Sequence, residues 1–295
     1  MGKTPSGWSN GFIGMLIFSG SLPATRLAVM AFEPLFLTGA RAGIAGLLAL
    51  AALLLFRQPR PSAPQWRSLT LVALGVVLGF PLLTALALQQ MTSAHSMVFM
   101  GLLPLSTAIF GVLRGGERPQ PSFWFFSLLG SALVIAFALS QGLGASWRGD
   151  LLMLLAIAVC GLGYAEGAKL SRDLGGWQVI SWALVLSLPA MLVLAAVQWP
   201  ATLAAVGAPA WLGLAYVSLF SMLIGFMFWY RGLAQGGIAA VGQLQLLQPF
   251  FGLALAASLL HEAVSPGMVG VTLAVILCVA GARHFAPATP RAEFR

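Results

Sequence analysis

A glutamate and a basic residue stand one helical turn apart inside an apolar stretch of the sequence. Glu166 and Lys169 are separated by three positions, so they would share one helix face and could form an ion pair. If the stretch crosses a membrane, such charges are costly and indicate function: part of a gate, or, for Glu166, a proton-sensitive group. The alternative is a structural pair in which Lys169 extends to the lipid headgroups.

Three glutamines gather in a second apolar stretch, before a proline. Gln245 and Gln248 would lie on one helical face, with Gln243 close by, and Pro249 leaves a carbonyl of the preceding turn without its usual N–H partner. Amides beside a loosened backbone could hold an amino or a carboxyl group. Hydrogen bonds between helices, commonly worth about 0.6 kcal/mol each, explain them equally well.

An earlier stretch holds aromatic and apolar candidates for the same site. His95 and Phe99 lie one turn apart, and Met100 and Leu103 follow. A pocket of apolar, aromatic and amide groups would suit an amphiphilic solute such as an apolar or aromatic amino acid. His95 could titrate near neutral pH, although a single histidine is more often a packing residue.

Tyrosine and tryptophan residues occur at two depths in the apolar stretches. Tyr164 and Trp182 lie well inside theirs and are further pocket candidates. Trp229 and Tyr230 stand near the end of a stretch, where such residues usually anchor at the membrane interface.

The elements that must position these groups are membrane-spanning helices. The 295 residues are 59% hydrophobic and only 7% charged, whereas soluble domains carry roughly 25% charged residues. This composition predicts an all-α polytopic membrane protein. The net charge of +8 resides mostly between apolar runs and forms no basic cluster, which argues against nucleic acid as a partner. Cys160 and Cys278 lie within apolar runs, so neither disulfide nor metal site is expected.

Prolines, glycines and charges divide the chain into ten expected spans joined by short connections, so that neighbouring helices should be antiparallel. A retained first helix is expected rather than a signal peptide, because the first run continues directly into a second. The expected spans are 10–31, 35–56, 67–90, 93–114, 121–141, 149–171, 177–198, 209–230, 237–260 and 264–285.

The basic residues predict the orientation of these spans. With the N-terminus in the cytoplasm, the outer side holds Arg148 in a connection, with Arg26 and Arg41 near span ends. Arg41 could guide an anionic group or extend to the outer interface. The inner side collects Lys3, Arg57, Arg60, Arg67, Arg114, Arg118, Lys169, Arg172, Arg231, Arg283, Arg291 and Arg295. This asymmetry follows the positive-inside rule and predicts that both termini are cytoplasmic.

The two halves of the chain resemble each other. Pro104 precedes Glu117 by 13 residues, and Pro249 precedes Glu262 by 13, at an offset of 145. Arg26-Leu27 likewise matches Lys169-Leu170. We therefore expect two five-helix repeats, residues 1–145 and 146–295, and an odd helix number makes the second one inverted. Inverted repeats predict alternating access with gates on both sides, here Arg26 on the outer and Glu166 with Lys169 on the inner side.

The whole pattern resembles the EamA-type bacterial exporters of the drug/metabolite transporter superfamily, over residues 10–285. The residues that carry the likeness are Pro23, Arg26, Glu33-Pro34, Arg41 and the two proline-to-glutamate repeats. Among members, the chain resembles the YddG-type amino-acid exporters. The chain departs from the family in its first span: a tryptophan often precedes the basic residue there, whereas this chain has Phe18-Ser19-Gly20-Ser21. The resemblance implies a bacterial inner-membrane location and export of small metabolites, amino acids prominent among them, without ATP hydrolysis.

The sequence thus predicts a carrier for a small solute, without cofactor or metal. It contains no GxxxxGK[ST] loop. An intramembrane enzyme is the alternative, but the three histidines, His95, His261 and His284, stand in different spans without a catalytic motif. A carrier or channel for another solute, such as a drug, nucleoside or sugar derivative, also stays open.

The GxxxG pairs, including Gly39/Gly43 and Gly232/Gly236, favour close packing within a monomer. With Glu166 as the one acid well inside a span, we expect facilitated export or at most single-proton coupling.

Overall fold

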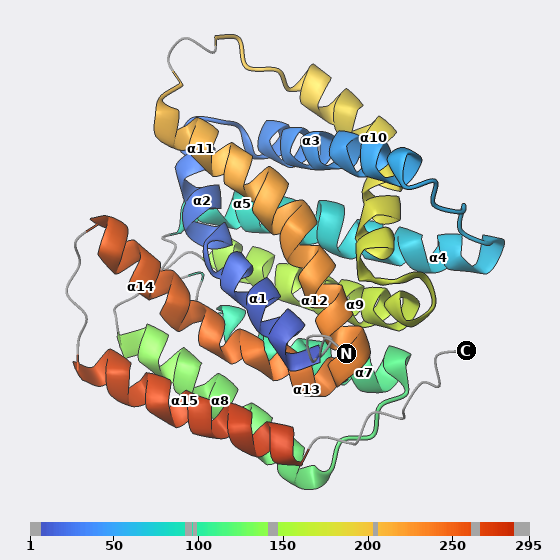
Figure 1. Cartoon of the computed structure of the whole chain (residues 1–295). Helices are drawn as coiled ribbons and strands as arrows, with labels where there is room; N and C mark the ends of the chain where they lie inside the picture. The colour runs from blue at the N-terminus through green and yellow to red at the C-terminus, as the bar shows by residue number, and fades with distance from the viewer. Residues whose placement is uncertain are drawn as a thin grey trace.

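The computed structural model describes residues 7–91, 96, 99–140, 147–202, 206–260 and 266–285, and over these residues all regular structure is helical. This confirms the all-helical prediction (Figure 1). In the first half the helices are α1 (Gly7–Ser19), α2 (Ser21–Val29), α3 (Pro34–Leu55), α4 (Ala63–Val72), the π-helix η1 (Ala73–Gly79), α5 (Phe80–Gln90), α7 (Leu103–Gly115) and α8 (Pro121–Ser140). In the second half they are α9 (Trp147–Leu174), α10 (Gly176–Val197), α11 (Ala208–Tyr216), the π-helix η2 (Val217–Ile224), α12 (Gly225–Gly236), α13 (Ile238–Gly242), the 3₁₀-helix η3 (Gln243–Leu247), α14 (Gln248–Leu260) and α15 (Pro266–His284).

Six helical stretches in the described part of the chain are long and apolar enough to cross a membrane. They are Gly7–Val29, Pro34–Leu55, Ala63–Gln90, Trp147–Leu174, Gly176–Val197 and Ala208–Gly236. Each coincides within a few residues with an expected span, which confirms those six. The other expected spans contain the shorter apolar helices Leu103–Gly115, Pro121–Phe137 and Gly270–His284, and the α13–η3–α14 stretch.

Helix ends follow local sequence signals. Pro34 begins α3 after Glu33, whose backbone is extended. Ser62 forms a capping box with Gln65 at the start of α4, and the Ser62 N–H donates to Gln65 Oε1 at 2.8 Å. Gly116 ends α7 with a φ of 69°, a left-handed conformation that glycine adopts without strain.

Two long helices contain π-helical segments at corresponding places. η1 interrupts the Ala63–Gln90 stretch and η2 interrupts the Ala208–Gly236 stretch, and their starts, Ala73 and Val217, are 144 positions apart. Pro81 follows η1 and has no N–H for an ordinary α-helical bond, which explains the wider turn there. In η2, Ser218 Oγ donates back to the Leu214 carbonyl at 2.6 Å, a bond that bends helices.

Helices from the two halves of the sequence pack side by side. α3 lies along α10, α8 lies along α15, and α1 lies along α12 (Figure 1). Glycines permit the closest approaches: a Cβ on Gly232 would stand 2.5 Å from the Gly11 nitrogen, and one on Gly39 would stand 2.7 Å from the Ala195 nitrogen. The expected role of the GxxxG glycines in close helix packing is confirmed at these two positions.

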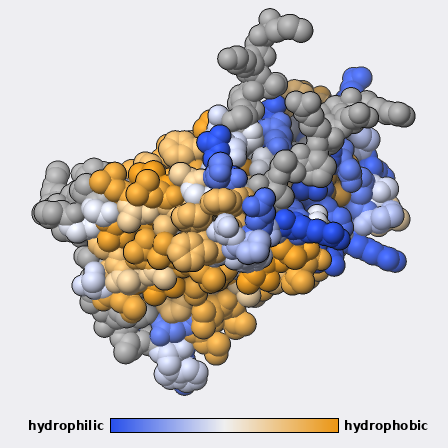
Figure 2. Space-filling view, turned by 90° about the horizontal axis from the view of Figure 1, so that it is seen from below, coloured by the Kyte–Doolittle hydropathy of each residue, from blue (hydrophilic) through white to orange (hydrophobic). Residues whose placement is uncertain are grey.

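The outer surface of the bundle is apolar. Leucine, isoleucine, valine and aromatic side chains are exposed along most helices, as at Leu55, Leu113 and Leu277. Figure 2 shows apolar residues covering most of one face, with hydrophilic residues gathered toward the side on which α4 and α7 lie in Figure 1. An exposed apolar surface of this extent is that of a protein surrounded by lipid.

Candidate solute pocket and inner polar network

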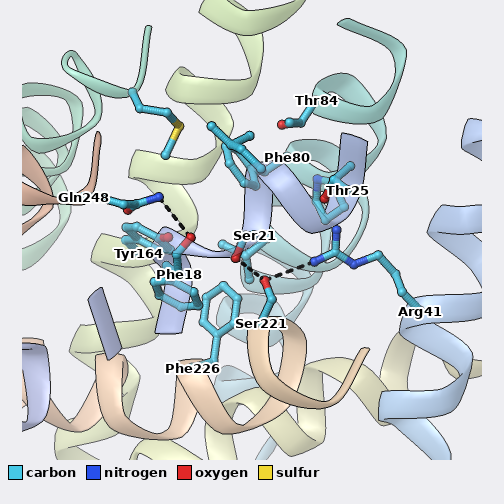
Figure 3. A pocket seen from close by; sticks show the side chains of 14 residues that line it. Phe18, Ser21, Thr25, Arg41, Phe80, Thr84, Tyr164, Ser221, Phe226 and Gln248 are labelled. Atoms are coloured by element: carbon cyan, nitrogen blue, oxygen red, sulfur yellow. Dashed lines mark hydrogen bonds between the residues drawn. The ribbon is translucent and has the colours of Figure 1, made fainter. Parts of the chain in front are cut away.

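A pocket lies among helices of both halves of the chain, with about 480 Å³ of space between atoms, part of it open to the surroundings. Its apolar lining consists of Phe18, Leu22, Val76, Phe80, Pro81, Met100, Tyr164 and Phe226. Its polar lining consists of Ser21, Thr25, Arg41, Thr84, Ser221 and Gln248. Figure 3 shows these side chains converging from different helices.

Breaks in regular α-helix surround this pocket. Val76 lies in η1 and Ser221 in η2, so both π-helical segments supply lining residues. Ser21 begins α2 directly after Gly20, where a Cβ would stand 2.5 Å from the Tyr216 hydroxyl. π-Helical turns are rare and occur frequently at functional sites, which fits a binding role for this place in the fold.

A chain of hydrogen bonds runs along one wall of the pocket. Ser21 Oγ donates to Ser221 Oγ at 2.9 Å, and Arg41 Nη2 donates to the same oxygen at 3.3 Å (Figure 3). On another wall, Gln248 Nε2 donates to the Phe18 carbonyl at 3.3 Å, while its Oε1 has no bonding partner among the described residues. The pocket therefore offers both donors and an acceptor to a solute.

An aromatic cluster, Phe18, Tyr164, Phe226 and Trp229, forms part of the pocket lining and packs behind it. Phe18 lies 5.0 Å from Phe226 and 6.0 Å from Trp229, centroid to centroid, and stacks on Tyr164 at 6.4 Å. Trp229 and Tyr230 are fully buried, so the expectation that they anchor at the membrane interface is wrong. They face the bundle interior because α12 packs between α1, α9 and α10.

Beyond the aromatic cluster, Glu166 joins helices of both halves. Its carboxylate accepts from Ser68 Oγ at 2.7 Å and from Arg114 Nε at 2.9 Å, and the residue is 1% exposed. Among the described residues, the ion pair that Glu166 forms is with Arg114 rather than the one expected with Lys169, whose side chain is exposed. α9 directs Glu166 toward Ser68 of α4 and Arg114 of α7.

A second carboxylate binds a helix start at the same end. Glu117, just after α7, accepts from the N–H of Ile238 at 2.6 Å and of Ala239 at 2.7 Å, at the first turn of α13. Arg172 Nη2 lies 3.5 Å from Glu117 Oε1. A carboxylate at a helix N-terminus satisfies free N–H groups and interacts favourably with the helix dipole. In the sequence, Glu117 was noted only for its repeated spacing from a proline. Nothing in the sequence indicated that its carboxylate would bind the start of α13.

The other candidates from the sequence lie in several places. Met100, Tyr164 and Gln248 line the pocket, whereas Gln243 and Gln245 are fully buried outside its lining, without hydrogen-bond partners among the described residues. Leu103 is buried in the core, Phe99 is partly buried against it, and Trp182 packs edge-to-face on Trp66 at 5.9 Å. Arg26 is partly buried and donates to the Leu88 carbonyl. His95 lies outside the described residues.

Comparison with known proteins shows the family. The sequence profile of the EamA-like transporter family matches residues 6–139 and again residues 147–283. The chain belongs to the EamA-like transporter family. It is thus a multi-pass membrane transporter, as its resemblance to the drug/metabolite transporter superfamily predicted.

Two Bacillus subtilis (strain 168) proteins and one solved structure illustrate the relationship. The chain is 70% identical over 286 residues to the "Uncharacterized transporter YdeK", covering 97% of this chain and 100% of that one. It is 23% identical over 234 residues to the "Uncharacterized transporter YyaM", covering 76% and 77% of the two chains. A protein of known crystal structure is similar in fold, with a TM-score of 0.75 at 20% identity, over 95% of this chain and 97% of the other. Neither transporter's name specifies a solute.

Proposed function

We propose that this transporter exports small metabolites, most of all apolar or aromatic amino acids, by alternating access and without ATP hydrolysis. The observation that carries the proposal is the pocket itself. It combines an aromatic surface with hydrogen-bonding side chains inside the bundle of a transporter. Such a lining suits a solute with an apolar side chain and polar ends.

We also propose that residues 1–145 and 146–295 are two inverted five-helix repeats. The family profile matches the chain twice, once in each half. The π-helices η1 and η2 start 144 positions apart, close to the offset of 145 between Glu117 and Glu262. Side-by-side packing of α3 with α10 and of α8 with α15, each pair from corresponding places in the two halves, further supports the symmetry.

In this proposal, the described conformation is one in which the pocket is closed toward the inner side of the membrane. Between the pocket and the end where α4 and α7 meet α9 lie the aromatic cluster and then the Glu166 contacts with Ser68 and Arg114. Those contacts link the first half to the second, so they must break if the halves separate there. Glu166 is therefore the inner gate residue in this proposal, with Arg114 as its partner, Lys169 as a neighbouring charge and Arg26 on the outer side.

The orientation proposed from the sequence, with both termini in the cytoplasm of a bacterial inner membrane, agrees with the distribution of polar surface. The end of α7, which carries Arg114, and the α3–α4 connection, which carries Arg57 and Arg60, lie toward one side of the bundle (Figure 1), and hydrophilic residues gather toward that side in Figure 2. By the positive-inside rule this side faces the cytoplasm.

Solute counterflow in proteoliposomes tests the proposed function. Purified protein would be reconstituted with a panel of amino acids inside, and entry of labelled amino acid would be followed. We expect saturable exchange for apolar or aromatic members. We expect Gln248→Ala to raise the half-saturation concentration about fivefold to tenfold, the effect of about one net hydrogen bond.

The matched control is Gln178→Ala, because Gln178 bonds Gln58 and does not line the pocket. It should leave the half-saturation concentration unchanged. Absence of exchange for every amino acid would refute the proposed solute class, and a non-saturating flux would indicate a channel instead.

A further inference from the structure

Arg41 is a buried cation beside the pocket. It is 6% exposed, so it does not extend to the outer interface, which was one of its two expected roles. Its Nη2 makes one long hydrogen bond, 3.3 Å to Ser221 Oγ, and its Nε has no partner among the described residues. No carboxylate of the described chain pairs with it.

A guanidinium in this position requires an anion. Arginine stays protonated in proteins, and removing its charge from water without a counter-ion is costly. Arginine, moreover, offers a planar set of donors that matches a carboxylate. Arg41 Nε is one donor without a partner among the described residues, and the pocket lining also contains the Thr84 hydroxyl, whose Oγ1 has no partner among them either.

The rest of the lining is complementary to the other parts of an amphiphilic anion. Phe18, Tyr164 and Phe226 form an aromatic surface opposite the arginine (Figure 3). Gln248 Oε1 is an acceptor without a partner among the described residues, able to take an ammonium hydrogen. The described lining contains no aspartate or glutamate.

We propose that Arg41 is the anion subsite of the pocket and binds the carboxylate of an amphiphilic solute whose apolar part packs on Phe18, Tyr164 and Phe226. The inference rests on the proposed function and deepens it. A carboxylate becomes the required group, while an amino group is accepted but not sufficient. The site therefore selects carboxylic acids and zwitterions, and rejects amines without a carboxylate.

Three ligands that share a phenyl ring and a two-carbon chain test this rule: L-phenylalanine, 3-phenylpropionate and 2-phenylethylamine. Their binding to the purified full-length protein would be measured by titration calorimetry. We expect both carboxylates to bind and the amine to bind at least about tenfold more weakly, the effect of losing one charge-assisted hydrogen bond. Binding of the amine as tight as that of 3-phenylpropionate, or no binding of either carboxylate, would overturn the proposal.

Substitutions assign the effect to Arg41. Arg41→Gln should weaken carboxylate binding at least about tenfold, and Arg41→Lys should retain part of it, because the charge remains without the planar fork. Arg148→Gln, at an exposed arginine that does not line the pocket, is the control and should bind as wild type does. Wild-type-like carboxylate affinity in Arg41→Gln would overturn the subsite, and the ligand comparison on the wild-type protein stands even if this variant fails to fold.

The outcomes separate this inference from the proposed function. If carboxylates bind in a way that depends on Arg41 but no counterflow is seen, the anion subsite is retained and the proposed carrier function is refuted. Amino-acid counterflow that Arg41→Gln leaves unimpaired would retain the carrier and refute the subsite.

Discussion

At the scale of single residues, the described part of the bundle contains buried polar atoms without a hydrogen-bond partner, three of them in the pocket lining. Among the described residues they include Arg41 Nε, Thr84 Oγ1 and Gln248 Oε1 in the lining, and both side-chain amide atoms of Gln243 and Gln245 nearby in sequence. A buried polar atom without a partner costs free energy, and in lipid no water compensates for it. Those in the pocket lining are therefore available to form hydrogen bonds with a solute.

Glu166 supports a residue-scale prediction about coupling. Its carboxylate is bonded to Ser68 and Arg114, which favours a structural ion pair over an exchangeable proton site. Replacing Glu166 with Gln should therefore leave counterflow measurable, with an unchanged pH profile. The matched control is Asp150→Asn at the other end of α9. Loss of transport at every pH in a folded Glu166→Gln protein would contradict uncoupled export.

The sequence identified individual polar residues better than their partners. Gln248 and Tyr164 could be selected because glutamine and tyrosine are unusual deep within apolar stretches. Lys169 was the expected partner of Glu166 because spacing along one helix is visible in sequence. The actual partner, Arg114, comes from another helix, and its approach depends on helix rotation and packing, which periodicity does not determine.

At the scale of elements, interruptions of regular α-helix position several residues of the pocket. η1, η2 and the break at Gly20 each place a lining residue in the pocket. The apolar runs were sufficient to predict where helices lie, because a span must be apolar over most of its length. They did not predict the π-helices, since an added residue in a turn leaves hydrophobicity unchanged. Pro81 after η1 was the available local signal.

Close packing of α1 on α12 supports an element-scale prediction about stability. A Cβ on Gly232 would stand 2.5 Å from backbone of α1, and backbone cannot yield as a side chain does. Gly232→Ala should lower the melting temperature of the detergent-solubilised protein, since overpacking typically costs about 1–3 kcal/mol. Gly270→Ala is the control, because a Cβ there meets nothing within 4 Å. Equal melting temperatures for the two variants would refute the tight α1–α12 contact.

At the scale of the whole molecule, the proposed inverted repeats give the two halves opposite orientations. Residue composition was sufficient to predict a membrane protein, because it is a property of the linear sequence, and the repeat of proline-to-glutamate spacing is the sequence basis of the proposed duplication. The packing of α3 on α10 and α8 on α15 could not be derived in the same way, because it depends on which helix faces meet.

Topology provides the prediction at this scale. Arg148→Cys should react with a membrane-impermeant maleimide from outside the cell, and Arg295→Cys should react only from the cytoplasmic side. Labelling in intact cells and in inverted vesicles distinguishes the two. If both cysteines reacted from the same side, the ten-span inverted arrangement would be wrong.

Alternating exposure of the pocket is the central claim, and side-dependent labelling of one lining residue tests it most directly. Ser221→Cys would be introduced after Cys160 and Cys278, both buried, are replaced by Ala. An impermeant maleimide should label it from outside in the resting protein, and from the cytoplasmic side when transported solute is supplied. Labelling from one side under all conditions, or from both sides regardless of solute, would contradict the account.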